Sequence, residues 1–384
     1  MSPTIRPKVV VDEESVEQTA YTLDLDLPTS GILSDLYLIV HARRVATTLG
    51  SNAWARNLIS SVSVNQAGQA FLNAAPPDVF QADYYYKTGK FPIIGTRRWE
   101  TYGDIEEVIP ILFGEKENDF DHTIDLSKLN DPKLSVTYDL EATDNESVCP
   151  WNTSVYPSFS VIANLMQGAD IPASKGYLSL RQIEKYTPAN SQVKAVELKG
   201  SRPIRRILFQ YDLKGIYLAM RQNVARIKLW GENEAWVPFD MTSERFKNLV
   251  KTIFGSGVAR GNYERWYSGR TINNIFDERD YLDIHVHNTV THDNYAYGGS
   301  GHGFMLKTVL SAEGTLAETD TQGYFEFAGI APWAVYPIDM KKMLGMDYLD
   351  PKEHAPVYLE LTHGSTAGDT PADIRVIVED LAQL

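Results

Sequence analysis

Apolar and polar residues alternate with a period of two in many segments of the chain. The clearest case is residues 21–27, where Tyr21, Leu23, Leu25 and Leu27 alternate with Thr22, Asp24 and Asp26. Such alternation places apolar side chains on one face of a strand and polar side chains on the other. Further segments rich in β-branched and aromatic residues lie at 36–40, 58–64, 134–138, 207–211, 227–230, 324–327, 358–361 and 374–378. These patterns predict an all-β protein.

Helical spacing is clear in one segment. Between residues 246 and 254 the apolar positions are Phe246, Leu249, Val250, Ile253 and Phe254, which share one face of a helix. We expect this helix to begin after an N-cap at Thr242 and to end at Gly255. A second helix is predicted over 78–87, behind two prolines and ending at Gly89.

The two halves of the chain show the same order of predicted elements. The strand segments marked by Leu27 and Leu36 in the first half have the same spacing as those marked by Leu198 and Ile207 in the second. Each half then has a helix that ends at a glycine, at positions 89 and 255. The sequence of residues 124–126, Ile-Asp-Leu, also resembles that of residues 338–340, Ile-Asp-Met. A fixed order at a long interval is the pattern of an internal duplication.

The duplication implies two units of unequal length. The interval between the helix end and the Ile-Asp element runs from residue 89 to 124 in the first half and from 255 to 338 in the second. The second half therefore holds a long insertion. We therefore predict an N-terminal tail at 1–14, a first domain at 15–175 and a second domain at 176–384. The insertion, at about 256–323, is expected to form surface loops.

Charge and cysteine content exclude several classes of protein. The chain has 36 basic and 50 acidic residues among 384, a net charge of −14 that disfavours binding to a phosphate backbone. Its single cysteine, Cys149, allows neither an internal disulfide nor a cysteine-rich zinc site. We expect neither a signal peptide nor a membrane-spanning segment, because no apolar run is long enough.

One histidine pair can be compared with a metal site. His285 and His287 are two residues apart on a predicted strand and share a face, with His302 further on. A cupin would add a glutamate soon after the pair, whereas none occurs between His287 and Glu313. We therefore expect these histidines to be solvated or interface residues and assign no metal site.

The other candidates for chemistry are equally incomplete. The glycine-rich stretch 298–303 lacks the strand, helix and Lys-Ser/Thr of a phosphate-binding loop, and Cys149 has no nearby histidine. Asp24 and Asp26 fit a solvated strand face better than a catalytic dyad. The sequence thus predicts no catalytic residue, no cofactor and no enzyme. Aromatic residues at 84–86, 266–267 and 333 suit either subunit interfaces or core packing.

The order of elements resembles that of the double jelly-roll major capsid proteins of the tectivirus and corticovirus-like, adenovirus-lineage viruses. The matching elements are 36–64 followed by 78–87 in the first half, 207–230 followed by 243–254 in the second, and the pairs 124–126 with 133–138 and 338–340 with 357–361. The resemblance implies two tandem jelly-roll β-sandwiches with a short helix inserted in each.

For function, the resemblance implies a structural protein of an icosahedral virion. It implies homotrimeric capsomers of pseudo-hexagonal outline, contacts with neighbouring capsomers and other virion proteins, and assembly in the host cytoplasm. An internal viral membrane would be touched by the N-terminal tail, and nucleic acid would not be bound directly. Two alternatives stay open at this point: a two-domain cupin-type metalloenzyme and a β-sandwich carbohydrate-binding protein.

Overall fold

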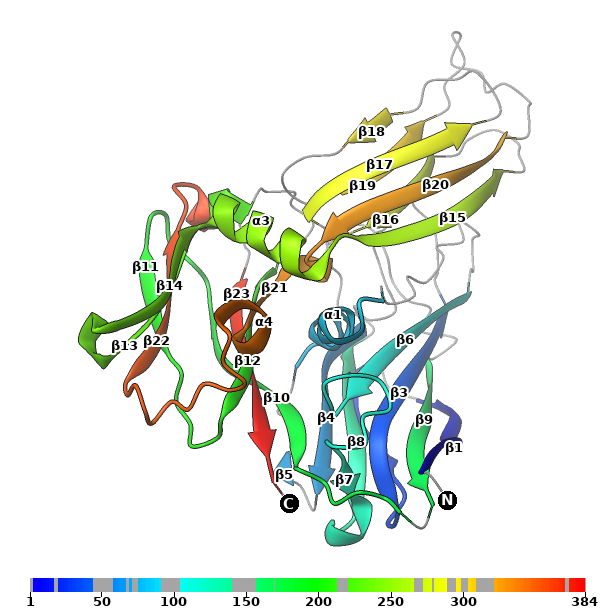
Figure 1. Ribbon diagram of the computed structural model, residues 1–384. Coiled ribbons are helices and arrows are strands. Elements are labelled where there is room, and N and C mark those ends of the chain that lie inside the picture. Colours follow the sequence, from blue (N-terminus) through cyan, green and yellow to red (C-terminus); the bar gives the residue numbers. More distant parts are fainter. Residues whose placement is uncertain are drawn as a thin grey trace.

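The computed structural model describes residues 3–16, 20–43, 58–66, 69–70, 75–90, 104–139, 157–168, 170–212, 220–265, 272–277, 280–288, 295–297, 303–308, 321–369 and 373–383. Four sheets of four main strands form its body, in two pairs (Figure 1). All eight further strand segments predicted from residue patterns lie in strands, apart from Leu58 just before one of them. The protein is all-β, as predicted.

The first pair of sheets is built from residues 4–167. The β1 sheet has the order β1 (Thr4–Ser15), β9 (Ser158–Gln167), β3 (Ile32–Arg43) and β6 (Asp104–Leu112), with β7 (Ile124–Asp125) also pairing with β3. The β2 sheet has the order β2 (Ala20–Asp26), β8 (Pro132–Asp139), β4 (Ile59–Gln66) and β5 (Gln69–Ala70). Together these two sheets form the first jelly roll.

The second pair of sheets repeats this arrangement with residues 177–382. The β10 sheet has the order β10 (Tyr177–Tyr186), β23 (Asp373–Ala382), β12 (Ile204–Asp212) and β21 (Val335–Asp339). The β11 sheet has the order β11 (Val193–Glu197), β22 (Val357–His363), β13 (Val224–Gly231) and β14 (Trp236–Thr242). These sheets form the second jelly roll.

Irregularities in strand pairing recur at equivalent positions in the two jelly rolls. The shift on β3 between Leu33 and Asp35 has its counterpart on β12 between Ile204 and Arg206, at the same interval that separates Leu36 from Ile207. The other matched shifts are Val9/Val11 with Gln182/Glu184 and Ile59/Ser61 with Val224/Arg226. A bulge depends on local sequence and is not required by the strand order. Its recurrence confirms the internal duplication and the alignment of β3 with β12.

Both predicted helices are present. α1 (Pro77–Thr88) ends at Gly89, which has a left-handed backbone with φ of 71° that favours glycine. α3 (Ser243–Phe254) begins after Thr242 and ends at Gly255, although the Thr242 side chain makes no capping hydrogen bond. Each helix has 12 residues and stops directly before the glycine that the sequence indicates. Shorter helical turns are η2 (Leu126–Lys128), α2 (Met220–Asn223), η3 (Glu232–Glu234), η4 (Pro332–Ala334), α4 (Met340–Leu344) and η5 (Ala367–Asp369).

The predicted insertion contains two small sheets of its own. One has the order β15 (Gly257–Arg265), β20 (Thr321–Ile330) and β17 (Asp280–Asn288), and the other β16 (Ile272–Asp277), β19 (Gly303–Thr308) and β18 (Tyr295–Tyr297). Figure 1 shows these strands together at the top, beyond the two jelly rolls. The described part of this segment is thus largely strand, where we expected loops.

Two details of the sequence interpretation were wrong. Residues 4–15 are not a tail but the edge strand β1, which pairs with β9. Most of its side chains are exposed, so it shows no core pattern, and Pro7 is tolerated because the strand lies at an edge. Residues 338–340 are also not the counterpart of 124–126: Ile124 pairs with Leu33, whereas the residue that bridges to the equivalent Ile204 is Leu349.

Candidate functional site

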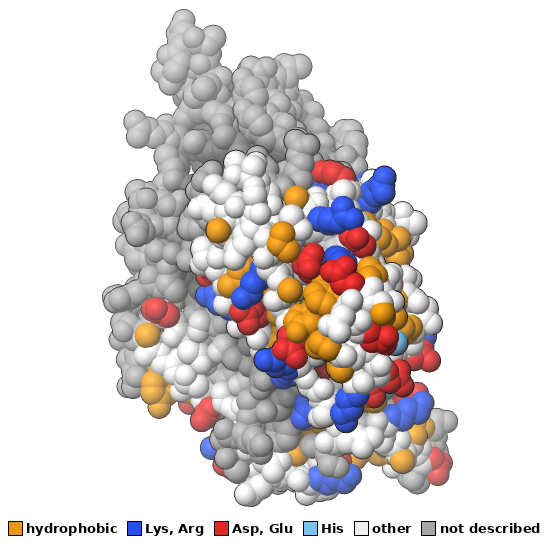
Figure 2. All heavy atoms as spheres, turned by 90° about the vertical axis from the view of Figure 1, so that its left-hand side faces the viewer, with side chains coloured by type: hydrophobic (Ala, Val, Ile, Leu, Met, Phe, Trp, Pro, Cys, Tyr) orange, Lys and Arg blue, Asp and Glu red, His pale blue; other side chains and the backbone are white. Residues whose placement is uncertain are grey.

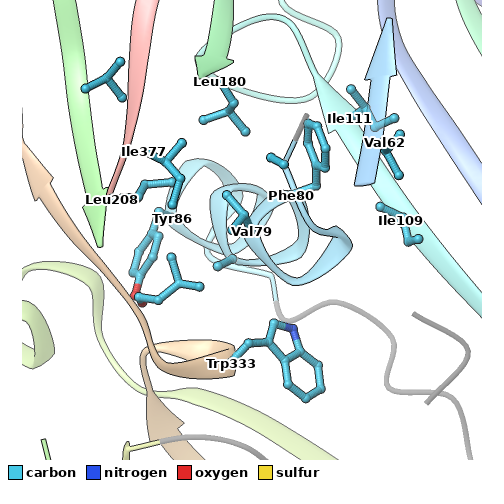
Figure 3. Packing of buried hydrophobic residues seen from close by; sticks show 14 of the residues in the cluster. Val62, Val79, Phe80, Tyr86, Ile109, Ile111, Leu180, Leu208, Trp333 and Ile377 are labelled. Atoms are coloured by element: carbon cyan, nitrogen blue, oxygen red, sulfur yellow. The ribbon is translucent and has the colours of Figure 1, made fainter. Parts of the chain in front are cut away.

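α1 lies between the two jelly rolls and is buried around most of its circumference. Its buried residues run from Pro77 to Tyr86 with only Asp78 partly exposed, so it lacks the one-sided apolar stripe of a surface helix. In Figure 3, Phe80 lies on the side of Val62 and Ile111, from the first jelly roll, and Tyr86 lies beside Leu208, from the second. The helix therefore belongs to both cores.

The tyrosine run of α1 fastens it to the second half of the chain. The Tyr86 hydroxyl donates to the Val335 carbonyl at 2.6 Å, and the Tyr85 hydroxyl donates to the Gly255 carbonyl at 3.0 Å. In return, Lys342 Nζ donates to the Tyr86 carbonyl at 3.0 Å. Of the two interpretations of these aromatics, core packing is the one that the structure supports, since Tyr85 and Tyr86 belong to the buried hydrophobic core.

A buried ion cluster lies where α1 meets the β10 sheet. Lys87 Nζ lies 2.8 Å from Asp83 Oδ2, one turn earlier, and 2.6 Å from Glu379 Oε1 on β23. Arg206 on β12 contacts Asp83 at 2.8 Å and lies 3.8 Å from Glu379. All four side chains are at most 3% exposed.

The cluster extends along the β10 sheet to the start of α4. Asp339 accepts from Arg206 Nε at 3.2 Å and from Arg205 Nη1 at 2.7 Å, and it also caps α4 by accepting from the Lys342 backbone N–H at 2.8 Å. The cluster (Asp83, Lys87, Arg205, Arg206, Asp339, Glu379) thus contains three cations and three anions. Buried charges persist only when they are paired in this way.

Burial and pairing shift the pKa values of the cluster in opposite directions. Burial raises the pKa of Asp83 to about 6 despite the nearby Lys87. Burial would also raise the pKa of Glu379, but Lys87 and Arg206 together lower it. Asp83 is therefore the carboxylate that takes up a proton first when the pH falls.

The structure describes the side chains of two of the predicted chemical candidates. Asp24 and Asp26 are exposed on β2, where Asp24 accepts from the Ser135 hydroxyl and Asp26 lies 3.6 Å from Lys133. His285 and His287 are on β17, opposite Glu326 and Tyr324, and their side chains lie outside the description. Cys149, His302 and residues 298–302 also lie outside the described residues.

Within the described ranges, no group of three or more histidine, cysteine, aspartate or glutamate side chains could hold a metal ion. None of the helices in the same ranges combines the length and the apolar character needed to cross a membrane. A hollow of about 330 Å³ between β10 and β11 is lined by charged residues that pair with each other, Lys194 with Glu184 and Lys199 with Glu197.

The outer face of the second jelly roll mixes apolar and charged side chains (Figure 2). Trp230 and Tyr358 stack there with their rings 4.5 Å apart, and Val193 and Val237 are exposed at two edges of the β11 sheet. This face thus exposes aliphatic side chains beside charged ones.

The arrangement of two jelly rolls in one chain is the fold of double jelly-roll capsid proteins. The major capsid protein of Sulfolobus turreted icosahedral virus superposes with a TM-score of 0.59 and 12% identity, covering 99% of this chain and 97% of that one. VP54 of PBCV-1 gives 0.53 and 9%, covering 99% and 93%. The major capsid protein P2 of bacteriophage PM2 gives 0.51 and 8%, covering 98% of each chain.

Sequence comparison adds nothing to this likeness: no protein-family model and no curated protein matches the chain. At 8–12% identity the structural matches establish the fold. The predicted double jelly roll is confirmed.

Proposed function

We propose that this protein is the structural major capsid protein of an icosahedral virus and forms trimeric, pseudo-hexagonal capsomers. The observation that carries the proposal is the duplicated jelly roll, locked into one unit by α1 and the buried ion cluster. Three such chains arranged in a ring present six similar walls, and a shape of that kind tiles a hexagonal lattice. The similar structures named above are capsid proteins, which supports a role in assembly and not in catalysis.

The proposal also assigns parts of the chain. The boundary between residues 175 and 176 separates the jelly rolls, and residues 256–323 face outward from the capsid. The partners are neighbouring capsomers and other virion proteins, in a virion assembled in the host cytoplasm. Contact with an internal membrane falls to the exposed β1 strand, which carries Arg6 and Lys8, since residues 4–15 do not form the tail we expected.

The experiment is size-exclusion chromatography with light scattering, followed by negative-stain microscopy of the peak. The expected mass is about 129 kDa, three times the 43.1 kDa chain, with a six-sided outline in projection. A monomer or a dimer across the micromolar range would refute the proposal.

A further inference from the structure

α1 and α3 are equivalent helices that differ in what covers them. α1 contacts β6 and β4 of its own jelly roll, and α3 contacts β14 and β13, of which β13 is the counterpart of β4. The face of α1 that includes Asp83, Tyr86 and Lys87 is completed by the second jelly roll. When the helices are aligned at Gly89 and Gly255, the same positions of α3 are Leu249, Thr252 and Ile253, which are half-buried or exposed. The face that is covered in α1 is therefore accessible in α3.

The receiving surface for α1 is the outer face of the β10 sheet. There, Arg206 and Leu208 on β12 are paired with Glu379 and Ile377 on β23. The matched bulges align β3 with β12, and the identical lengths of β9 and β23 align Ser158 with Asp373. The counterparts in the β1 sheet are then Asp35, Tyr37, Asn164 and Ile162, paired in the same way on β3 and β9.

The outer face of the β1 sheet is apolar and accessible near its middle. Leu36, Leu38 and Val40 are fully buried in the core, so Tyr37 and Ile39 between them point to the opposite face. Both are half-buried, as is Ile162, and Val9, paired with Ile162, is 56% exposed. The positions on this face are equivalent to those that α1 covers on the β10 sheet. Within the described chain, however, no helix lies on this face.

We infer that the two remaining faces bind each other between copies: α3 of one copy docks on the outer face of the β1 sheet of a second copy. This contact repeats, between chains, the packing of α1 on the β10 sheet within one chain. It rests on the proposed function and adds the surfaces through which copies meet. Because the two faces differ, the contact is head-to-tail, and a head-to-tail contact closes into a ring when its rotation fits.

The charges of the two faces are complementary. The exposed charged side chains of α3 include Arg245 and Lys251, whereas the Ile39 end of the β1 sheet carries exposed acidic side chains, namely Asp12, Glu13 and Glu14 on β1 and Glu106 on β6. Within the chain, Asp78 at the start of α1 contacts Gln210. The counterparts are Glu244 and Ile39, so the repeated packing brings both Glu244 and the more exposed Arg245 to the acidic end, and the attraction comes from the net positive charge of α3. Complementary charge of this kind orients partners at docking.

The contact between copies differs in chemistry from the one within the chain. Asp83 and Lys87 of the ion cluster are replaced by Leu249 and Ile253, and the facing Arg206 and Glu379 by Asp35 and Asn164. Asp35 and Asn164 are themselves buried in the chain, and Asp35 accepts from the Asn118 backbone N–H at 2.9 Å and the Ser34 hydroxyl at 3.1 Å. The part of the face open to a second copy is therefore the apolar middle around Tyr37, Ile39 and Ile162, with charges at one end.

The experiment is cross-linking of paired cysteine variants in the full chain. Cys149→Ser removes the native thiol, and two further single variants, Glu244→Cys on α3 and Ile39→Cys on β3, are produced together in one cell. A short bismaleimide should then join the two variants between chains, with loss of the single-chain band in a denaturing gel. Each variant alone should give no cross-link, since the contact is head-to-tail. Glu244→Cys produced with Thr22→Cys, on the exposed face of the β2 sheet, is the matched control and should also give none.

Light scattering on the same samples separates the possible failures. A trimer in which the Glu244 and Ile39 variants stay unlinked, or in which the control pair is linked instead, overturns this inference and leaves the proposed function standing. A cross-link with Glu244→Cys alone also overturns it, because it would mean a symmetric contact. If every sample is monomeric, and the variants melt at the same temperature as the parent protein, both this inference and the proposed function are overturned.

Discussion

Replacement of Lys87 by methionine tests whether the buried ion cluster holds the two jelly rolls together. Lys87 lies 2.8 Å from Asp83 and 2.6 Å from Glu379, and methionine fills a similar volume without the charge. The change leaves two cations with three anions at a site that is almost fully buried. Removal of one partner from a buried ion group costs about 3–5 kcal/mol.

The pKa of Asp83 sets where in that range the loss should fall. Burial already raises the pKa of Asp83 to about 6, and the loss of the neighbouring Lys87 charge would favour its protonation further. A protonated Asp83 would relieve the charge imbalance, so we expect a loss of about 3 kcal/mol at pH 7.5 and a smaller loss at pH 5.

The assay is guanidinium unfolding followed by tryptophan fluorescence at both pH values. Lys90→Met is the control, because Lys90 is 61% exposed in its pair with Glu117 and should contribute at most about 1 kcal/mol. If Lys87→Met lowers the free energy of unfolding by less than about 1 kcal/mol, or by the same amount at both pH values, the ion cluster does not hold the two jelly rolls together as argued.

Three further substitutions test the raised pKa of Asp83 and the packing of α3. The raised pKa of Asp83 disfavours its ionised form in the folded state, so the stability that Asp83 contributes is present below about pH 4 and is lost as the pH rises through about 6. The stability of Asp83→Asn relative to the parent protein should therefore rise between these pH values. A difference in unfolding midpoints that does not change with pH would contradict the raised pKa. Phe246→Ala should cost about 3–5 kcal/mol, because Phe246 is fully buried against Phe209, Phe239 and Tyr336. Phe254→Ala should cost less than Phe246→Ala, since Phe254 is only half-buried, and the reverse order in thermal unfolding would show that the stripe packs differently.

The sequence was informative wherever one face of an element is buried by its own domain. Alternation located β2, and the i, i+3, i+4 stripe located α3, because each places apolar side chains on a single core. β1 escaped detection since an edge strand with exposed side chains has no such pattern. α1 was found from its prolines and its glycine, not from amphipathicity, which it lacks because two domains bury it.

The ion cluster could not be predicted from one sequence. Asp83, Arg206 and Glu379 are far apart in the chain, and a charged residue in a strand pattern usually indicates an exposed face. A weak signal does exist, since Arg206 directly precedes the apolar run 207–209 and Glu379 directly follows the apolar run 376–378. Pairing these residues with a helix from the other half requires the tertiary structure.

The place of β23 in its sheet constrains the order in which the molecule can be completed during synthesis. β23 is made after every other strand of the β10 sheet, yet it lies between β10 and β12. Until it emerges from the ribosome, those two strands lack the neighbour that joins them, and Lys87 lacks the Glu379 carboxylate. A nascent chain that stops short of residue 379 thus has all strands of the first jelly roll but an α1 that lacks its contact with β23. Translation as far as β23 is therefore required before the second jelly roll can be completed.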